Sequence, residues 1–130
     1  MATIFTKIIE GEIPAHKIAE DENYLAFLDI APLQKGHTLV IPKKEVNKIF
    51  DLDTATLTGL MAFAQPIAKA IEKTFPCDRV GVAVIGLEVP HAHVHLIPIN
   101  QMKDMSFEQP KMEISHEELA QIAMVIKENL

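Results

Sequence analysis

The feature that most constrains the fold is the segment 91–97, in which histidines alternate with apolar residues. Side chains on a β-strand point alternately to its two faces, so this order fits a strand with His91, His93 and His95 on one face. Neighbouring imidazoles on that face stand about 7 Å apart. The intervening apolar side chains then face a core: Ala92, Val94 and Leu96. The segment therefore predicts a strand over 91–99 that presents a row of imidazoles.

The rest of the chain predicts a mixture of helices and strands. Apolar residues at steps of three and four predict a long helix over 54–74, with Asp53 as its N-cap and a kink or brief break at Pro66. A short helix is expected over 4–10, and Ser115-x-x-Glu118 predicts the start of a last helix through Ile126. Strands are expected over 15–19, 24–29, 37–41, 80–85 and 91–99. Runs of adjacent strands favour an α+β fold with a mainly antiparallel sheet of about five strands.

Length and charge limit the class of protein. The 130 residues suit one domain with its own core. A net charge of −6 and the lack of a lysine and arginine block argue against a nucleic-acid partner. No segment approaches the roughly 18 apolar residues of a membrane helix, and no signal peptide is recognisable, so we expect no membrane partner and a cytoplasmic location. The single cysteine, Cys77, excludes an internal disulfide and a multi-cysteine zinc site.

The clustering of histidines indicates a functional site. Half of the six histidines lie within five residues, which is unusual for a purely structural role. Imidazoles can hold zinc, usually with a further ligand, for which Glu88 and His37 are available. Imidazole also titrates near neutrality, so one ring can attack an electrophile while others donate hydrogen bonds. The residues alone leave both chemistries open.

The pattern His91-Ala92-His93-Val94-His95-Leu96-Ile97 resembles the signature of the histidine triad (HIT) family. Three further stretches are similar to sequences of that family: 4–14, 27–32 and 36–43. The resemblance covers about residues 3–100 and is greatest to the Hint-type branch, whose members are nucleotide-binding homodimers. It implies one HIT domain over 1–130, with a core over 3–100 and a C-terminal loop and helix over 101–130. It also implies one long helix with short N- and C-terminal helices, and assembly as a homodimer.

The resemblance also implies an activity and its residues. The expected reaction releases a nucleoside monophosphate, such as AMP, from a phosphoramidate or other purine nucleotide conjugate, without a cofactor or a metal. His93 is the implied nucleophile at the α-phosphorus, forming a nucleotidyl-histidine that water cleaves. The other implied catalytic residues are His95, His91 and His37. Asp29 matches the carboxylate that binds the ribose hydroxyls. The remaining implied nucleotide-binding residues are Ile13, Phe27, Leu28, Ile30, Glu88 and Val89.

The chain departs from the family pattern in three ways. Many members hold a structural zinc ion with Cys-x-x-Cys and a histidine, where this chain has Thr3, Thr6 and Glu45, so we expect no such zinc site. The loop 81–90 is short and lacks the asparagine, glutamine and hydroxyl side chains that serve the phosphates. Glu88 stands about where the hydroxyl is expected, and its charge would repel a phosphate unless it orients a histidine or binds a cationic leaving group. A nucleotide-binding or scaffold protein with vestigial activity and a zinc hydrolase therefore remain as alternatives.

Overall fold

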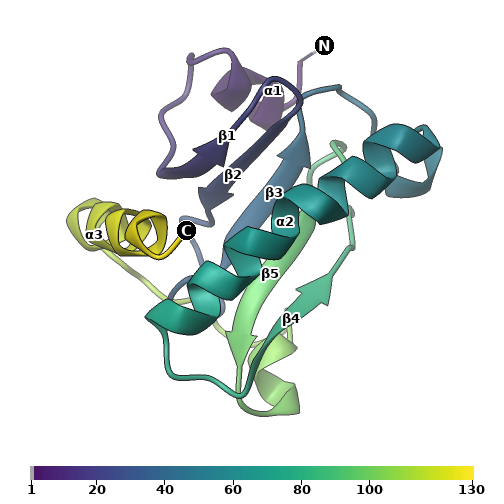
Figure 1. The fold of residues 1–130 in the computed structure, drawn as a ribbon. Helices are drawn as coiled ribbons and strands as arrows, with labels where there is room; N and C mark the ends of the chain where they lie inside the picture. Colours follow the sequence, from purple (N-terminus) through teal and green to yellow (C-terminus); the bar gives the residue numbers. More distant parts are fainter. Residues whose placement is uncertain (1) are drawn as a thin grey trace.

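A five-stranded antiparallel sheet forms the centre of the computed structural model, which describes residues 2–130 (Figure 1). The strands are β1 (Lys17–Glu20), β2 (Tyr24–Leu28), β3 (Thr38–Pro42), β4 (Arg79–Ala83) and β5 (Val94–Ile99). Their order in the sheet is β1-β2-β3-β5-β4, with every neighbouring pair antiparallel. The predicted α+β class and antiparallel sheet are confirmed, although the last strand begins at Val94 and not at His91.

Helices cover both faces of this sheet. The long helix α2 (Thr54–Thr74) crosses one face, with α3 (His116–Glu128) beside it over β1 and β2 (Figure 1). The short helix α1 (Ile4–Ile9) packs against the opposite face. Two short 3-10 turns complete the structure: η1 (Ile49–Asp51) and η2 (Met102–Met105). Because both faces are covered, β2 and β3 are buried at every position, in contrast to the half-exposed strands of a sheet that faces water on one side.

Two hydrophobic cores follow from the alternation of side chains along the strands. The core on the α2 face joins residues such as Leu28, Val40 and Leu96 to the apolar stripes of α2 and α3. The core on the α1 face joins Phe5 and Ile8 of α1 to the alternate strand residues, whose side chains point to the opposite face of the sheet. Those strand residues are Leu25, Phe27, Leu39 and Ile41.

The N-terminal ends of α2 and α3 agree with the capping residues expected from the sequence, but α2 differs from the expectation at Pro66. Asp53 Oδ2 accepts a hydrogen bond from Thr56 N at 3.1 Å, and Ser115 Oγ accepts one from Glu118 N at 3.1 Å. The helix α2 continues without interruption through Pro66, where we expect a kink or a brief break. Pro66 and Ala62 are both exposed, so the carbonyl that loses its partner can bond water. None of the helices in residues 2–130 combines the length and apolar character that crossing a bilayer requires.

Candidate active site

Cross-strand pairing places His95 in a row of side chains on the α1 face of the sheet. His95 of β5 lies opposite Leu39 of β3 and opposite Ala83 of β4. Phe27 of β2 also lies opposite Leu39. Directly paired residues share a face of the sheet, so His95 stands above the core that α1 covers. His37, which immediately precedes β3, comes to the same place from a position 58 residues away in the chain.

His91 and His93 precede the strand, yet they point to the same side as His95. Their rings make edge contacts with Phe5 of α1, at centroid distances of 5.7 Å for His91 and 5.0 Å for His93. The ring of His93 lies 4.9 Å from that of His95. The alternate residues Ala92 and Val94 are buried in the core on the α2 face. The alternation therefore predicts the facing of the imidazoles correctly, although a regular strand begins only at Val94.

Backbone carbonyls fix which nitrogen of His91 and of His93 carries a proton. His93 Nδ1 lies 2.7 Å from the carbonyl oxygen of His91, and His91 Nε2 lies 2.8 Å from that of Pro42. A carbonyl oxygen only accepts, so each of these ring nitrogens must donate. A neutral imidazole carries one N–H, which leaves a lone pair on Nε2 of His93. On His91 the lone pair is on Nδ1, which accepts from the hydroxyl of Thr3 at 3.0 Å.

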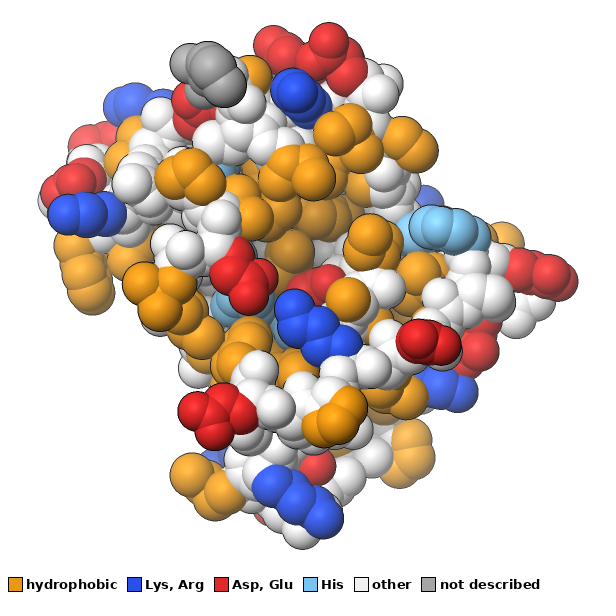
Figure 2. Space-filling view, turned by 180° about the vertical axis from the view of Figure 1, so that it is seen from behind, with side chains coloured by type: hydrophobic (Ala, Val, Ile, Leu, Met, Phe, Trp, Pro, Cys, Tyr) orange, Lys and Arg blue, Asp and Glu red, His pale blue; other side chains and the backbone are white. Residues whose placement is uncertain are grey.

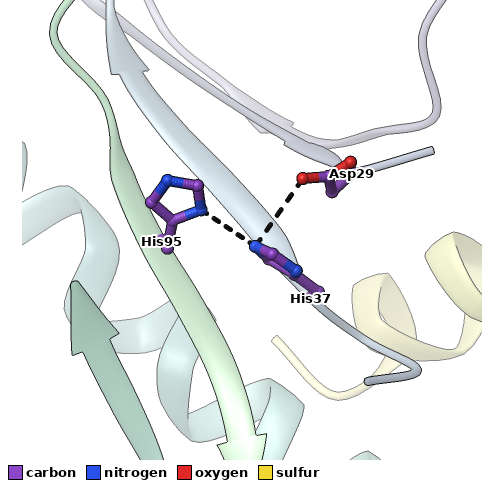
Figure 3. Close-up of side chains that lie close together, drawn as sticks. All are labelled: Asp29, His37 and His95. Carbon is purple, nitrogen blue, oxygen red and sulfur yellow. Dashed lines mark hydrogen bonds and ion pairs between the residues drawn. The ribbon is translucent and has the colours of Figure 1, made fainter. Parts of the chain in front are cut away.

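A chain of hydrogen bonds fixes the protons of His37 and His95 in the same way. The backbone N–H of Leu33 donates to His37 Nδ1 at 3.1 Å, so the proton of a neutral His37 is on Nε2. His37 Nε2 lies 2.9 Å from His95 Nδ1 and donates to it (Figure 3). His95 then carries its own proton on Nε2. Its Nε2–H is therefore free to donate into the space in front of the sheet.

Burial keeps the rings of His37 and His95 neutral at pH 7. Loss of solvent contact lowers the pKa of His37 to about 4, with smaller contributions from the charge of Lys111 and from the neighbouring His93. The same loss of solvent contact lowers the pKa of His95 to about 3, helped by the neighbouring His37 and His93. Both rings therefore act as neutral hydrogen-bond donors near neutrality.

Asp29 lies beside this histidine pair, and the three side chains have a spacing that suits a metal ion. Asp29 Oδ2 is 3.7 Å from His37 Nε2, and one ligand atom from each of Asp29, His37 and His95 lies within 4.8 Å of the others (Figure 3). The protonation of His37 does not suit a metal, because its Nε2 carries the ring proton while Nδ1 accepts from Leu33. We therefore interpret this cluster as a hydrogen-bonded group and not as a metal centre.

The carboxylate of Asp29 is held at the end of β2. Its Oδ1 accepts a hydrogen bond from the backbone N–H of Ala31 at 2.9 Å. Partial burial raises the pKa of Asp29, and the hydrogen bond from Ala31 and the charge of Lys111 oppose this shift. Because Oδ1 is already engaged, Oδ2 is the oxygen available to a ligand.

A cavity of about 400 Å³ opens in front of these groups. Its walls are largely apolar, and polar groups gather at one end. Figure 2 shows this hollow with orange walls, and with red, blue and pale-blue side chains meeting at its lower edge. The lining residues are Ile4, Phe5, Asp29, Ile30, Leu33, His37, Leu39, Ile85, Gly86, Leu87, Glu88, Val89, His93, His95, Phe107 and Lys111.

Most of the site residues expected from the sequence line this cavity. They are His93, His95, His37, Asp29, Ile30, Glu88 and Val89. His91 is fully buried behind His93, where it contacts Thr3 and Pro42. Its position supports a role in holding the backbone and the ring of His93.

Three expected wall residues lie elsewhere. Phe27 is buried beneath Phe5, whose ring makes an edge contact with it at 5.5 Å, and Ile13 packs against the same core. Leu28 belongs to the core on the α2 face. Adjacent strand residues point to opposite faces, so Phe27 and Leu28 cannot both face the cavity. We therefore remove Leu28 from the wall and place Phe27 one layer below it, while the half-buried Ile13 packs against the core on the α1 face without lining the cavity.

The sequence does not reveal two residues that complete the cavity. Phe107 and Lys111 come from the irregular segment that follows η2. The ring of Phe107 makes an edge contact with the ring of His95 at 4.8 Å. No motif or periodicity marks these residues, because only the return of the chain over the sheet brings them to the histidines.

The three residues that stand in place of a zinc site are hydrogen-bonded to one another. Glu45 Oε1 accepts from the backbone N–H of Thr3 at 3.0 Å and from the hydroxyl of Thr6 at 2.5 Å. These hydrogen bonds lower the pKa of Glu45. The hydroxyl of Thr3 also reaches His91 Nδ1. This network ties the start of α1 to the histidine segment with oxygen and nitrogen groups alone.

Comparisons with known proteins show the family and the fold of the chain. Residues 10–102 match the family model described as the HIT domain. The adenosine 5'-monophosphoramidase of Schizosaccharomyces pombe is 36% identical over 121 residues, covering 92% of this chain and 91% of that protein. A Hit-like protein from Bartonella henselae has a crystal structure that superposes with a TM-score of 0.87 at 36% identity, covering 98% of this chain and 96% of that one. A Zn-bound histidine triad family protein from Mycobacterium smegmatis superposes with a TM-score of 0.84 at 30% identity, covering 99% and 93%.

Proposed function

The chain belongs to the HIT family, and on that premise we propose that it is a phosphoramidase that releases AMP from adenosine phosphoramidates and related purine nucleotide conjugates. The observation that carries the proposal is the hydrogen bond between His93 Nδ1 and the carbonyl of His91, which leaves the lone pair of His93 on Nε2. The name of the yeast relative, at 36% identity over 92% of this chain, supports the choice of substrate.

We propose a reaction in two displacements at the α-phosphorus. In the first, His93 Nε2 forms a bond to phosphorus, the bond from phosphorus to the leaving nitrogen breaks, and that nitrogen takes a proton from solvent. In the second, a water oxygen bonds to phosphorus, the bond to Nε2 breaks, and the water gives up a proton. Two displacements through an imidazole replace one difficult step by two easier ones.

His95 is proposed to stabilise the charge that develops during both displacements. Its Nε2–H has no acceptor in the hydrogen-bond chain from Leu33 through His37, so it can donate to a phosphoryl oxygen or to the leaving group. The neutral state of both rings, caused by burial, supports this role because Nδ1 of a neutral His95 accepts from His37, so its one proton is held on Nε2. His37 is proposed as a positioning residue that acts through His95.

The remaining pocket residues are proposed to bind the nucleoside. Asp29 Oδ2 is available to accept from the ribose hydroxyls, since Oδ1 is occupied by Ala31. The exposed side chain of Ile30 and the apolar walls from Ile4 and Leu87 offer surface for a purine ring. A carboxylate for the sugar and apolar walls for the base suit a nucleotide, whose base is flat and weakly polar on its faces.

Product analysis tests the proposed activity. We expect the wild-type protein to convert adenosine 5'-phosphoramidate to AMP, and His93→Ala to lose at least about a hundredfold in kcat because the nucleophile is absent. His116→Ala is the matched control, since His116 is exposed at the start of α3 and lies outside the cavity. Circular dichroism should show the same fold for both variants. Equal turnover by His93→Ala and the wild type would refute the proposed nucleophile.

A second candidate function is nucleotide binding with only vestigial turnover. It is favoured by Glu88, which lines the cavity where neutral phosphate donors are expected in the family. This candidate predicts that AMP binds in a calorimeter while no conjugate is hydrolysed at a measurable rate. Release of AMP that depends on His93 would exclude it.

We also propose that the chain forms a homodimer through the edge of the sheet at β4. In residues 2–130, β4 pairs on one side with β5 and ends the sheet on its other side. Val82 of β4 is 51% exposed, and Val84 and Ile85 just after it are exposed as well. An apolar strand with unpaired backbone groups at the edge of a sheet favours association with another strand.

A further inference from the structure

The segment 100–114, which follows β5 and lies mostly beyond the matched HIT domain, is fixed over the candidate active site. At its start, Asp104 Oδ2 accepts from the backbone N–H of Asn100 at 2.8 Å and of Gln101 at 3.1 Å. Near its end, the N–H of Met112 donates to the carbonyl of Pro32 at 2.8 Å. The segment is therefore held by hydrogen bonds at both ends: its start is bonded within the segment, and its end is bonded to the loop that follows Asp29.

Phe107 lies between these two anchors and packs on the histidines. Its ring makes edge contacts with His95 at 4.8 Å and with His37 at 6.3 Å. The half-buried ring excludes water from one side of the His37–His95 pair. The segment thus forms part of the cavity wall nearest to the groups proposed to act on a phosphate.

Lys111 immediately precedes Met112, whose backbone N–H is hydrogen-bonded to Pro32, and it is the lysine among the residues that line the cavity. It lines the cavity together with His93 and His95, and its charge contributes to the pKa values of Asp29, His37 and His95. In residues 2–130, the ion pairs of the lysines involve Lys17, Lys35, Lys43 and Lys44, so Lys111 has no carboxylate partner. Lys111 is therefore an exposed lysine that lines the cavity and has no ion pair.

The phosphate side of the cavity is short of other donors. The loop 84–90 contributes Ile85, Gly86, Leu87, Glu88 and Val89 to the lining, and none of these side chains donates a hydrogen bond. Glu88 adds a negative charge that disfavours an anion. A bound phosphoryl group would therefore depend on His95, on backbone N–H groups and on a cation from another element.

We propose that Lys111 forms a cationic phosphate subsite of the cavity, and that this lysine replaces the neutral donors missing from the loop 84–90. The proposal rests on the proposed nucleotide function and adds a residue from outside the matched HIT domain. Lys111 binds the phosphoryl oxygens of a nucleoside monophosphate or its conjugates, and it offsets the repulsion from Glu88. The site therefore prefers nucleotides to nucleosides chiefly through this one side chain.

Calorimetric titration of the full chain with AMP and with adenosine tests the proposal. We expect Lys111→Met to weaken AMP binding about tenfold and to leave adenosine binding unchanged, because only AMP carries the phosphate that the ammonium group binds. Lys111→Arg should bind AMP within about threefold of the wild type, since the charge is retained. Lys103→Met is the matched control, because Lys103 is exposed in η2 of the same segment and does not line the cavity.

Either of two results for Lys111→Met would overturn the subsite. If Lys111→Met binds AMP as tightly as the wild type, the lysine does not contact the phosphate. If it weakens AMP and adenosine equally, the lysine is only part of the apolar wall. Wild-type protein that binds neither AMP nor adenosine would instead refute the proposed nucleotide function itself, and the subsite with it. Retention of His93-dependent AMP release together with unchanged binding by Lys111→Met would refute the subsite alone.

Discussion

At the scale of single residues, backbone groups determine the protonation pattern of the four clustered histidines. Two carbonyls require donors from His91 and His93, and one amide requires an acceptor from His37. The consequence is a lone pair on His93 Nε2 beside an N–H on His95 Nε2. Such an arrangement places a nucleophile next to a hydrogen-bond donor, and neither His37 nor His95 is ionised at pH 7.

Replacement of His37 should alter the protons of His95 without removing a group that touches substrate. In the wild type at pH 7, we expect 15N NMR to show the protonated nitrogen of His95 as Nε2. In His37→Ala, His95 Nδ1 loses its donor, so a mixture of tautomers and a kcat lower by about tenfold are expected. His16→Ala, outside the cavity, should leave both measurements unchanged. An unchanged His95 spectrum in His37→Ala would contradict the positioning role.

At the scale of elements, the turn between β2 and β3 carries His37 to its place. Gly36 has φ of +95°, and a Cβ added there would meet the ring of Phe75 at 2.6 Å. The residue must therefore lack a side chain for two reasons, backbone conformation and the close approach of the ring. Gly11 shares the positive φ, at +83°, but a Cβ there would meet nothing within 4 Å.

The two glycines make a matched pair of tests. Gly11→Ala should cost about 1 kcal/mol of unfolding free energy, from backbone strain alone. Gly36→Ala should cost about 3 kcal/mol, because the same strain is joined by a clash with a core side chain. Urea unfolding followed by circular dichroism measures both values. Equal losses for the two variants would show that Phe75 moves aside freely.

At the scale of the whole molecule, burial of His37 and His95 makes stability depend on pH. Both rings have pKa values below the usual 6.5 in the folded protein, so the unfolded chain binds more protons between about pH 6.5 and pH 4. The stabilising contribution is therefore complete above pH 6.5 and is lost as the pH falls. We expect a loss of about 2 to 5 kcal/mol between pH 7 and pH 4.5, measured by urea unfolding. His95→Asn should show a shallower decline, and a constant stability over this range would contradict the assignment.

The exposed edge at β4 predicts an assembly that can be disrupted by a single charge. We expect the wild type to sediment as a dimer and Val82→Lys to sediment as a monomer, because a lysine on an edge strand disfavours pairing with a second strand. Phe50→Lys is the matched control, since Phe50 is 87% exposed in η1, away from β4. A wild-type monomer, or a Val82→Lys dimer, in analytical ultracentrifugation would refute the proposed interface.

The sequence by itself determined the features that depend on local periodicity and on capping. Alternation over 91–97 predicted which side chains share a face, and the stripe over 54–74 predicted the bounds of α2. These predictions succeed because the repeat of a strand or helix is fixed by backbone geometry. The same rule could have excluded Leu28 from the cavity once Phe27 was assigned to the α1 face.

The tertiary structure alone decided which of these side chains meet in the cavity. It buried His91 behind His93 in contact with Thr3, and it joined His37 to His95 across 58 residues. It also packed Phe107 on His95 and brought Lys111 to the cavity wall. Contacts of this kind depend on how the elements pack and on the path of an irregular segment. No local repeat encodes that path, so residues after position 100 contribute to the candidate site without any mark in the sequence.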